Sequence, residues 1–520
     1  MINYWWVTRP KRKLNSVPST LAVFAEEALN EVWNKQRASH ISLEEALEKQ
    51  HLKRTGTRRD HTGGGGRTYA AWLRSLGLLF NQTETKQIKL TLAGEAIMAG
   101  ESPVKIIRNQ ILKYQFPSTF SIGRGVKVNP RFHIHPFWFL FRLLMDDRIE
   151  YLTEEELAKI VITEADKETD KCYEYIVSRI LQFRDYGDAC LDPEFNQKYG
   201  TSKQNSRRAD PFAHLTDTAN TIMNWMEYTQ YISREKQKMY VLDEAKSEVQ
   251  KILNHPLPFI KRPEDEEYFQ RRYGLDLNHS KDTRNLLDTQ TVTPYIIAEH
   301  LVRQEFISLS LTQLISGITP EITNTIAENT GLDPNLVADT LQKFFPHGSI
   351  GSYMANYFEM AFRGREECRD FEIATSQIFN DVFKFDAKHI AGGAKEVPDV
   401  LLVSDSAGYQ AIIDTKAYSR YDLGAQQRDR MIYHYLPEIH NYSDSGYPLA
   451  FFSYIAGGFS RTIEQPLQKI VKASGINGSA MPVSNFIKLA EIHSSTPFSH
   501  EELRRIFSLN RKVELSDIMK

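Results

Sequence analysis

Two aspartates and a lysine, Asp399, Asp414 and Lys416, form the most reactive combination of side chains in this sequence. Asp399 completes the only Pro-Asp pair in the chain, and one residue separates Asp414 from Lys416. Side chains two apart on a strand point to the same face, so Asp414 and Lys416 are expected to lie together. Carboxylates suit Mg²⁺, which takes oxygen ligands and usually binds one or two carboxylates plus substrate phosphate. Thr415 points away, but its backbone carbonyl stays within reach of the same ion.

A cation at this position polarises a phosphodiester and lowers the pKa of an attacking water. Lys416 then orients that water or takes its proton. We therefore predict phosphodiester hydrolysis with Mg²⁺ as cofactor and Mn²⁺ as a substitute. The acid-x-Lys tripeptide alone is weak evidence, because residues 84–86, 244–246 and 386–388 fit it too. The alternative interpretation is a strand end with a surface aspartate and lysine.

A β-hairpin is predicted to position these residues. Arms at 400–403 and 409–416, rich in Val, Leu and Ile, flank residues 405–408, whose types favour a turn. If the hairpin is symmetric about Ser406 and Ala407, Asp399 faces Asp414. Like charges placed opposite each other destabilise a strand pair, and a divalent cation between them would reverse that penalty.

The composition is that of a globular protein. With 520 residues and 41% hydrophobic content, the chain is expected to hold roughly two to four domains. Cys172, Cys190 and Cys368 are widely spaced, which argues against a disulfide framework and a zinc site. The start lacks the charged and apolar regions of a signal peptide, and the chain has no long apolar run. We expect a cytoplasmic protein with no membrane association.

Basic residues are concentrated in the first quarter of the chain. Residues 1–134 contain 21 Lys and Arg against 10 Asp and Glu, a net charge of +11, whereas the whole chain carries −2. Such clustering is typical of a nucleic-acid contact surface. The alternative is chance clustering on a solvated face.

Two winged-helix domains are predicted. In the first, helices are expected at 24–33, from Ser42 and at 68–77, with a two-stranded wing at 78–90 and a helix at 92–98. Its third helix, with Tyr69 and Arg74, would enter a major groove. The second begins at a capping box around Thr153 and continues with helices at 173–183 and 216–228, a wing at 230–242 and a helix from Asp243. The same pattern also serves interfaces between proteins.

These domains and their basic loops supply residues that we expect to contact phosphates or base edges of DNA. They are Lys11, Arg12, Arg58, Arg59, Arg67, Arg74, Lys113, Arg124, Lys127, Arg131, Lys203, Arg207 and Arg208. Nearby, His133 and His135 lack an acidic or cysteine partner in the sequence. We interpret them as a packed or DNA-facing pair and not as metal ligands.

Four segments are predicted along the chain. They are winged-helix domains at 1–145 and 146–255, a helical linker at 256–345, and an α/β domain with a mixed sheet at 346–520. The fold class is therefore multidomain, mainly α in its N-terminal recognition region and α/β in its C-terminal domain.

The C-terminal segment resembles the FokI-like cleavage domains of type IIS restriction endonucleases, which carry the PD-(D/E)xK motif. The resemblance rests on residues 388–390, 392–393, 398–399, 414–419, 429 and 431. Residues 57–100, 113–118 and 128–130 are similar to the AlwI group of type IIS and nicking endonucleases. The resemblance implies Mg²⁺-dependent cleavage of double-stranded DNA at a short fixed distance from an asymmetric site.

The resemblance also implies individual roles. Asp399 and Asp414 match metal ligands, Lys416 matches the catalytic lysine, and Glu372 matches an additional acid found in many such nucleases. Glu372 is alternatively a surface helix residue.

Asp429 matches an acidic residue of a dimer-forming helix, in which Tyr433 takes the place of the partner arginine. We expect a transient homodimer on DNA and a cognate DNA methyltransferase as functional partner without stable contact. Gln427 lies near a family glutamine.

Three alternatives stay open. The first alternative is a site-specific nicking endonuclease. The second is a winged-helix DNA-binding protein with an inactive nuclease domain, and the third is an RNA or repair nuclease without sequence specificity. The intact set of Asp399, Asp414 and Lys416 argues against the second. The long N-terminal region argues against the third.

Overall fold

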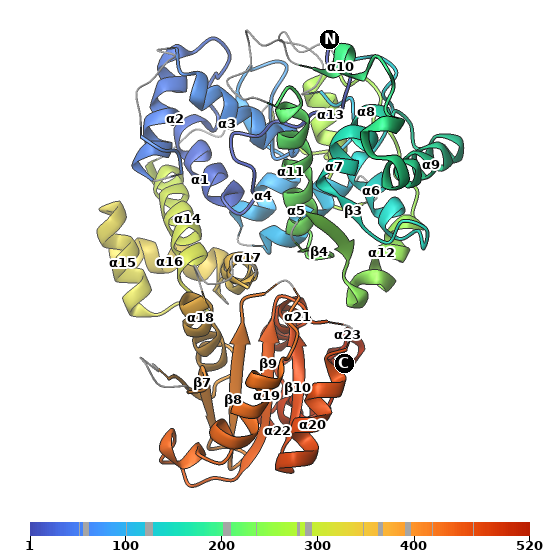
Figure 1. The fold of residues 1–520 in the computed structure, drawn as a ribbon. Coiled ribbons are helices and arrows are strands. Elements are labelled where there is room, and N and C mark those ends of the chain that lie inside the picture. The colour runs from blue at the N-terminus through green and yellow to red at the C-terminus, as the bar shows by residue number, and fades with distance from the viewer. Residues whose placement is uncertain are drawn as a thin grey trace. The chain divides into compact units, whose positions relative to one another are not determined.

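The computed structural model forms two compact units (Figure 1). It describes residues 1–50, 52–55, 62–99, 101–119, 128–200, 210–235, 237–277, 281–286, 294–346, 348–361, 368–390, 397–418, 420–460 and 462–519. The first unit comprises Met1–Leu309 and Thr319–Pro346, and the second comprises Ser310–Ile318 and His347–Lys520. In the described part of the chain, no helix has both the length and the apolar character to cross a bilayer.

The first unit opens with helices and a two-stranded wing in the predicted order. Its first helix ends at Ala28, so the predicted bounds of 24–33 are wrong. Its elements are α1 (Val17–Ala28), α2 (Arg37–Lys49), α3 (Gly64–Ser75), β1 (Leu79–Asn81), β2 (Ile88–Leu90) and α4 (Leu92–Met98). The strands β1 and β2 pair antiparallel, and the Thr91 hydroxyl caps α4 by accepting from the Gly94 amide. The predicted start of the second helix at Ser42 is wrong. Ser42 lies inside α2, where its hydroxyl donates to Glu27.

The elements predicted for the second winged helix are also present. Its region contains α5 (Pro103–Leu112), α6 (Pro136–Leu144), β3 (Leu152–Thr153), α7 (Glu154–Glu156), η1 (Leu157–Val161), α8 (Ile162–Glu164), α9 (Asp170–Tyr186), η2 (Gly187–Cys190), α10 (Phe195–Tyr199), α11 (Ala213–Tyr228), β4 (Ile232–Glu235), β5 (Lys238–Val241), η3 (Asp243–Ala245) and α12 (Lys246–Leu253). The capping box of Thr153 and Glu156 is present. The three strands form a small sheet in the order β3-β5-β4.

The segment predicted as a linker is in part an integral piece of the first unit. It contains α13 (Glu266–Tyr273), α14 (Pro294–Thr312), α15 (Pro320–Thr330) and α16 (Pro334–Phe344). In α13, Gln270 donates to the Arg74 carbonyl at 2.7 Å, and the Tyr273 hydroxyl donates to the Gln110 carbonyl at 2.5 Å. Gly77 has a positive φ, and a Cβ there would collide with the Tyr273 ring. The prediction of a separate linker that starts at residue 256 is therefore wrong for the part that forms α13.

The second unit is built on a mixed five-stranded sheet, as predicted, in the order β10-β9-β8-β7-β6. Its elements are α17 (Ile350–Met360), α18 (Cys368–Asp381), β6 (Asp386–His389), β7 (Val400–Ser404), β8 (Tyr409–Lys416), α19 (Ala425–Arg430), η5 (Met431–Tyr435), η6 (Ile439–Asn441), β9 (Leu449–Ala456), α20 (Glu464–Ser474), β10 (Asn477–Pro482), α21 (Val483–Ser495), α22 (His500–Phe507) and α23 (Leu515–Ile518). The strands β8, β9 and β10 are parallel. Strand β7 pairs antiparallel with β8, and β6 pairs antiparallel with β7. The sequence did not predict β6 or α21.

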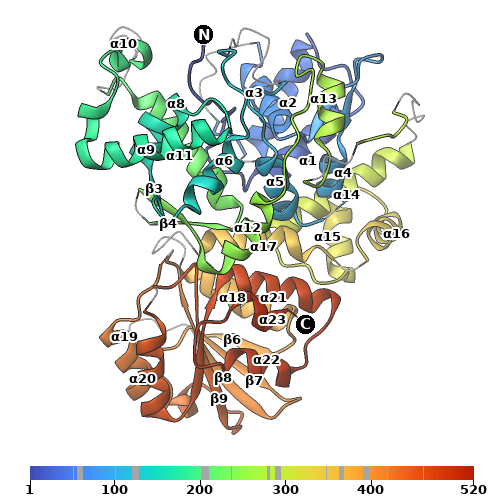
Figure 2. The same ribbon diagram turned by 90° about the vertical axis from the view of Figure 1, so that its right-hand side faces the viewer.

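Helices cover both faces of this sheet. Figure 2 shows α19 and α20 on one side and α18, α21 and α22 on the other. Alternate residues of β8 enter the two layers: Ile413 joins the core under α18 and α21, and Ile412 joins the core under α19 and α20. By the same alternation Asp414 and Lys416 share the α19 face.

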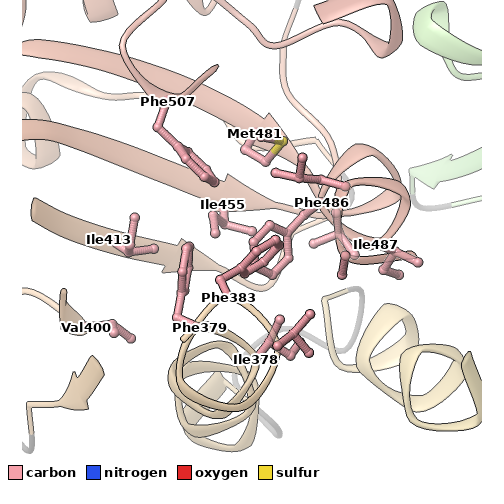
Figure 3. Packing of buried hydrophobic residues seen from close by; sticks show 14 of the residues in the cluster. Ile378, Phe379, Phe383, Val400, Ile413, Ile455, Met481, Phe486, Ile487 and Phe507 are labelled. Atoms are coloured by element: carbon pink, nitrogen blue, oxygen red, sulfur yellow. The ribbon is translucent and has the colours of Figure 1, made fainter. Parts of the chain in front are cut away.

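Aromatic rings fill the core under α18 and α21 (Figure 3). Phe379 of α18 lies 5.6 Å from Phe383, 5.2 Å from Phe486 and 5.8 Å from Phe507, measured between ring centroids. Such pairs stabilise a core beyond the burial of their area. These contacts hold α18, α21 and α22 against the strands that carry the aspartates.

Replacing Phe379 by alanine should destabilise the second unit by about 3–5 kcal/mol, because a cavity would remain among rings that cannot collapse into it. Urea unfolding followed by aromatic fluorescence measures this loss. Tyr433→Ala is the control, since Tyr433 is exposed. Equal unfolding curves for Phe379→Ala and the wild type would contradict the assigned core.

Candidate active site

The hairpin has the predicted register. Strand β7 pairs antiparallel with β8, and Val400 lies opposite Ile413. Continuing that register by one residue places Asp399 across from Asp414. The turn at residues 405–408 closes the hairpin, with the Gly408 amide donating to the Ser404 carbonyl.

Four residues meet at this end of the hairpin. The Asp399 Oδ2 atom accepts from the Thr415 amide at 2.5 Å and from its hydroxyl at 2.9 Å. The Lys416 Nζ atom lies 2.8 Å from Asp414 Oδ2 and 3.7 Å from Asp399 Oδ2, and it donates to the Thr415 carbonyl at 2.9 Å. The ammonium group therefore links both carboxylates.

The electrostatics follow from burial and proximity. Burial raises the pKa of Asp414 to about 7; Lys416 opposes this shift, and Asp399 adds to it. Burial alone would lower the pKa of Lys416, but Asp414 and then Asp399 raise it, so the net shift is upward. Two carboxylates lie close together in a poorly solvated position, and such a position favours a bound cation.

The donor set fits a hard divalent cation. Asp399, Asp414 and the Thr415 carbonyl offer only oxygen atoms, and Mg²⁺ needs no more than one or two carboxylates when substrate phosphate completes its shell. Across the described ranges, no group of three or more His, Cys, Asp or Glu side chains is placed to hold a metal. In a site with so few protein ligands, water and substrate phosphate complete the shell of Mg²⁺.

Glu372 lies on α18, and its carboxylate contacts His389 at the end of β6, with 3.0 Å between Oε2 and Nε2. Burial raises the pKa of Glu372, and the nearby charge of Asp399 raises it further. His389 was not predicted to take part. Its role is visible only when β6 is placed beside β7, because the sequence of β6 is short and polar. A catalytic role for Glu372 stays a prediction.

A cavity of about 450 Å³ opens beside Asp414 and Lys416. Its walls come from the end of β8, from the segment after β8 and from α19 with η5, and include Tyr421, Gln427 and Arg430. Of these, only Gln427 was considered from the sequence. Tyr421 and Arg430 were missed, because nothing in their local sequence shows that the helix folds back over the strand end.

Two residues predicted to contact DNA are buried instead. Arg74 donates to Asn81 and pairs with Glu266 at 3.5 Å, and Lys113 donates to the carbonyls of Tyr273 and Gly274 at 2.5 and 3.1 Å. Their charges connect α13 to the rest of the first unit, so the predicted DNA contacts are wrong.

Tyr69 is buried as well, and its hydroxyl donates to the Leu52 carbonyl. The predicted recognition face of α3, which included Tyr69 and Arg74, therefore faces the protein interior.

Other predicted DNA contacts have different surroundings. Arg131 is half-buried and donates to Asn3 and to the Thr163 carbonyl, a geometry that does not support a DNA contact. Arg12 is exposed and pairs with Asp217, Arg67 is exposed and donates to Thr62, and Lys11 is half-buried. The predictions for Arg58, Arg59, Arg124, Lys127, Lys203, Arg207 and Arg208 lie outside the described residues.

His133 and His135 are packed. The ring of His133 stacks on Phe259 at 3.7 Å, and His135 Nδ1 lies 3.1 Å from Glu168 Oε2.

The two predicted dimer residues lie on one helical segment. Asp429 accepts from Arg428 at 3.0 Å, and Tyr433 is 66% exposed.

Two family models match this chain. Residues 331–514 match the FokI cleavage domain, and residues 95–273 match the N-terminal domain of the type II restriction endonuclease HgaI. These matches confirm the resemblance to type IIS restriction endonucleases with a FokI-like cleavage domain. The predicted N-terminal similarity was to the AlwI group, whereas the matching model is named for HgaI.

Individual relatives show the same similarity over parts of the chain. The type II restriction enzyme StsI of Streptococcus sanguinis is 28% identical over 151 residues, which are 27% of this chain and 24% of that protein. The type II restriction enzyme FokI of Planomicrobium okeanokoites is 24% identical over 208 residues, which are 35% of this chain and 34% of that protein. The matched stretches thus span about a quarter to a third of these relatives. The solved structure of restriction endonuclease FokI aligns over 99% of this chain and 100% of that chain, at 15% identity and a TM-score of 0.29.

The burial of Lys113 predicts a pH dependence of stability. Burial lowers the pKa of Lys113 from 10.5 to about 7. Between these values the unfolded chain binds more protons than the folded chain, so this residue makes stability rise with pH.

The free energy of unfolding of the wild type, relative to Lys113→Met, should therefore increase from about pH 7 to pH 9 by roughly 1 kcal/mol or more per pH unit. Urea titrations at both pH values measure the difference. A pH-independent difference would mean that Lys113 keeps its proton inside the fold.

Proposed function

We propose that this chain is a type IIS restriction endonuclease that binds a short asymmetric site in double-stranded DNA and cuts a short fixed distance away. The observation that carries the proposal is the cluster of Asp399, Asp414, Thr415 and Lys416 at the end of a buried hairpin. The matches to a restriction-enzyme cleavage domain and to a restriction-enzyme N-terminal domain support the same conclusion. The recognised sequence and the cut positions are properties to be measured.

In this proposal Asp399, Asp414 and the Thr415 carbonyl hold Mg²⁺, with Mn²⁺ as a substitute. The ion supplies Lewis acidity toward the scissile phosphate and acidifies water. Thr415 fixes the Asp399 carboxylate through its amide and hydroxyl, so the ligand is oriented before substrate arrives. Lys416 donates hydrogen bonds toward the attacking water or a phosphate oxygen. Its contact with the Thr415 carbonyl limits the directions in which the ammonium can point.

Incubation of the protein with plasmid DNA and Mg²⁺ tests the proposal directly. Run-off sequencing of the products should give one recognition sequence and constant cut offsets. Cuts confined to one strand would favour a nicking endonuclease. An intact plasmid together with specific binding would favour a DNA-binding protein with an inactive nuclease domain.

Asp414→Asn should reduce cleavage by about a thousandfold or more, because a metal ion contributes several kcal/mol to stabilising the transition state. DNA binding should persist, since the proposed reading surface lies in the other unit. Rates come from plasmid cleavage, and affinities come from fluorescence anisotropy with a duplex containing the sequenced site.

Asp405→Asn is the matched control, because Asp405 is an exposed aspartate in the turn of the same hairpin. Cleavage by Asp414→Asn within tenfold of the wild type would refute the assigned metal site.

A second part of the proposal concerns the cutting of two strands. The chain has one Pro-Asp…Asp-x-Lys set, and one such centre attacks one phosphodiester at a time. We propose a transient homodimer on DNA, formed through the segment that carries Asp429 and Tyr433. A cognate DNA methyltransferase would be a functional partner without stable contact.

Cleavage of both strands should therefore rise more than linearly with enzyme concentration, and nicked circles should accumulate when enzyme is scarce. Asp429→Arg should slow second-strand cutting more than first-strand cutting, by about tenfold, since a charge reversal at an interface costs roughly 1–3 kcal/mol. Gel analysis of supercoiled, nicked and linear plasmid measures both steps. Asp444→Arg, the same change at another exposed aspartate, is the control.

A further inference from the structure

The cavity beside the metal-site residues is lined entirely by residues of the second unit, and Asp399 is not one of them. It starts at Asp414 and Lys416 and continues along Tyr418, Tyr421 and Arg430. Its volume of about 450 Å³ falls in the range of small-ligand pockets, roughly 300–1,000 Å³. It therefore has room for a ligand beside Asp414, one of the proposed metal ligands.

Tyr421 lines this cavity, and its buried hydroxyl is unsatisfied. The residue is 5% exposed, and its hydroxyl makes no hydrogen bond to any described protein group. Its ring is held by Tyr418, stacked at 6.1 Å and 23°, and by Phe459 at 6.3 Å. Buried hydroxyl groups are normally hydrogen-bonded, because leaving one unpaired costs free energy. A rigid ring with an unused donor is suited to an acceptor that arrives from outside.

The charges of the wall indicate what kind of acceptor arrives. Lys416, Arg420 and Arg430 contribute three positive charges, against Asp414 and Asp422. Asp414 pairs with Lys416, and Asp422 accepts from the Ser460 hydroxyl. Because Lys416 and Asp414 offset each other, the lining has a formal excess of one positive charge, and this excess favours an anion.

An exposed aromatic surface completes the site. Tyr418 is about half exposed at the cavity and stacks on Tyr421. Nucleobases stack on such rings with little dependence on sequence. A hydrogen-bond donor for a phosphate, positive charge and a stacking surface occur together here, next to the proposed site of cleavage.

We infer that this cavity binds the nucleotide next to the scissile phosphate in the strand being cut. Its phosphate accepts hydrogen bonds from the Tyr421 hydroxyl and from Arg430, and its sugar and base lie against Tyr418. This inference rests on the proposed function, because it places the neighbouring nucleotide beside Asp414 and Lys416. It adds two substrate-binding residues that place the strand relative to the metal site.

Thymidine 3′,5′-bisphosphate is a suitable probe, because it presents a sugar, a base and two phosphates without a cleavable diester. Isothermal titration into the full chain with Ca²⁺ should detect its binding. Tyr421→Phe should weaken this binding by about tenfold to a hundredfold, the effect of losing one hydrogen bond to a charged group. Arg430→Gln should weaken it as well.

Tyr454→Phe is the matched control. Tyr454 is 0% exposed and its hydroxyl also lacks a protein partner among the described groups, but it does not line the cavity. This variant should bind the bisphosphate within twofold of the wild type. Thermal melts of the three variants check that each is folded.

Equal affinities for Tyr421→Phe, Arg430→Gln and the wild type would overturn the inference. Inorganic phosphate binding as tightly as the bisphosphate would also overturn it, because the site would then recognise an anion and not a nucleotide. Plasmid cleavage by the wild type is scored separately. Failure to cut refutes the proposed function, whereas loss of bisphosphate affinity in Tyr421→Phe still supports a nucleotide site.

Discussion

Two carboxylates face each other across a pair of strands, and the rest of the second unit depends on how that repulsion is balanced. Lys416 contacts both of them, and Thr415 donates twice to Asp399. Without a counter-charge, such a pair would push the strand ends apart. The lysine provides part of that charge from the next position on the same face of β8. The remaining oxygen atoms favour a cation, so the two facing carboxylates that need a counter-charge are also the groups suited to chemistry.

The sheet that carries these carboxylates is packed on both faces. One core lies under α18 and α21 and is rich in phenylalanine, whereas the other lies under α19 and α20. Strand β8 is central, with β7 antiparallel on one side and β9 parallel on the other. Its side chains alternate between the two cores until Asp414, where the α19 face opens into the cavity. Consecutive residues of β8 thus contribute to the two hydrophobic cores and to the proposed metal site.

The first unit shows that a basic sequence does not translate directly into a basic surface. Arg74 and Lys113 lie inside, where they bind Glu266 or the carbonyls at the end of α13. Long cationic side chains serve here as connectors, because each can satisfy several carbonyl or carboxylate oxygens at once. Arg12 and Arg67 are exposed, and DNA contacts by these two residues stay predictions.

The sequence alone determined the hairpin, its register and the meeting of Asp399, Asp414 and Lys416, because a short turn and a period of two leave little freedom. The prediction that the Thr415 side chain points away was wrong, since its hydroxyl donates to Asp399. The sequence also determined the winged-helix order, since turn and capping signals are local. Tertiary structure decided which cations are buried, that α13 packs on the first unit, that His389 holds Glu372, and that Tyr421 and Arg430 line a cavity. These outcomes depend on contacts between residues far apart in the chain, such as the parallel pairing of β8 with β9, for which local residue types carry no signal.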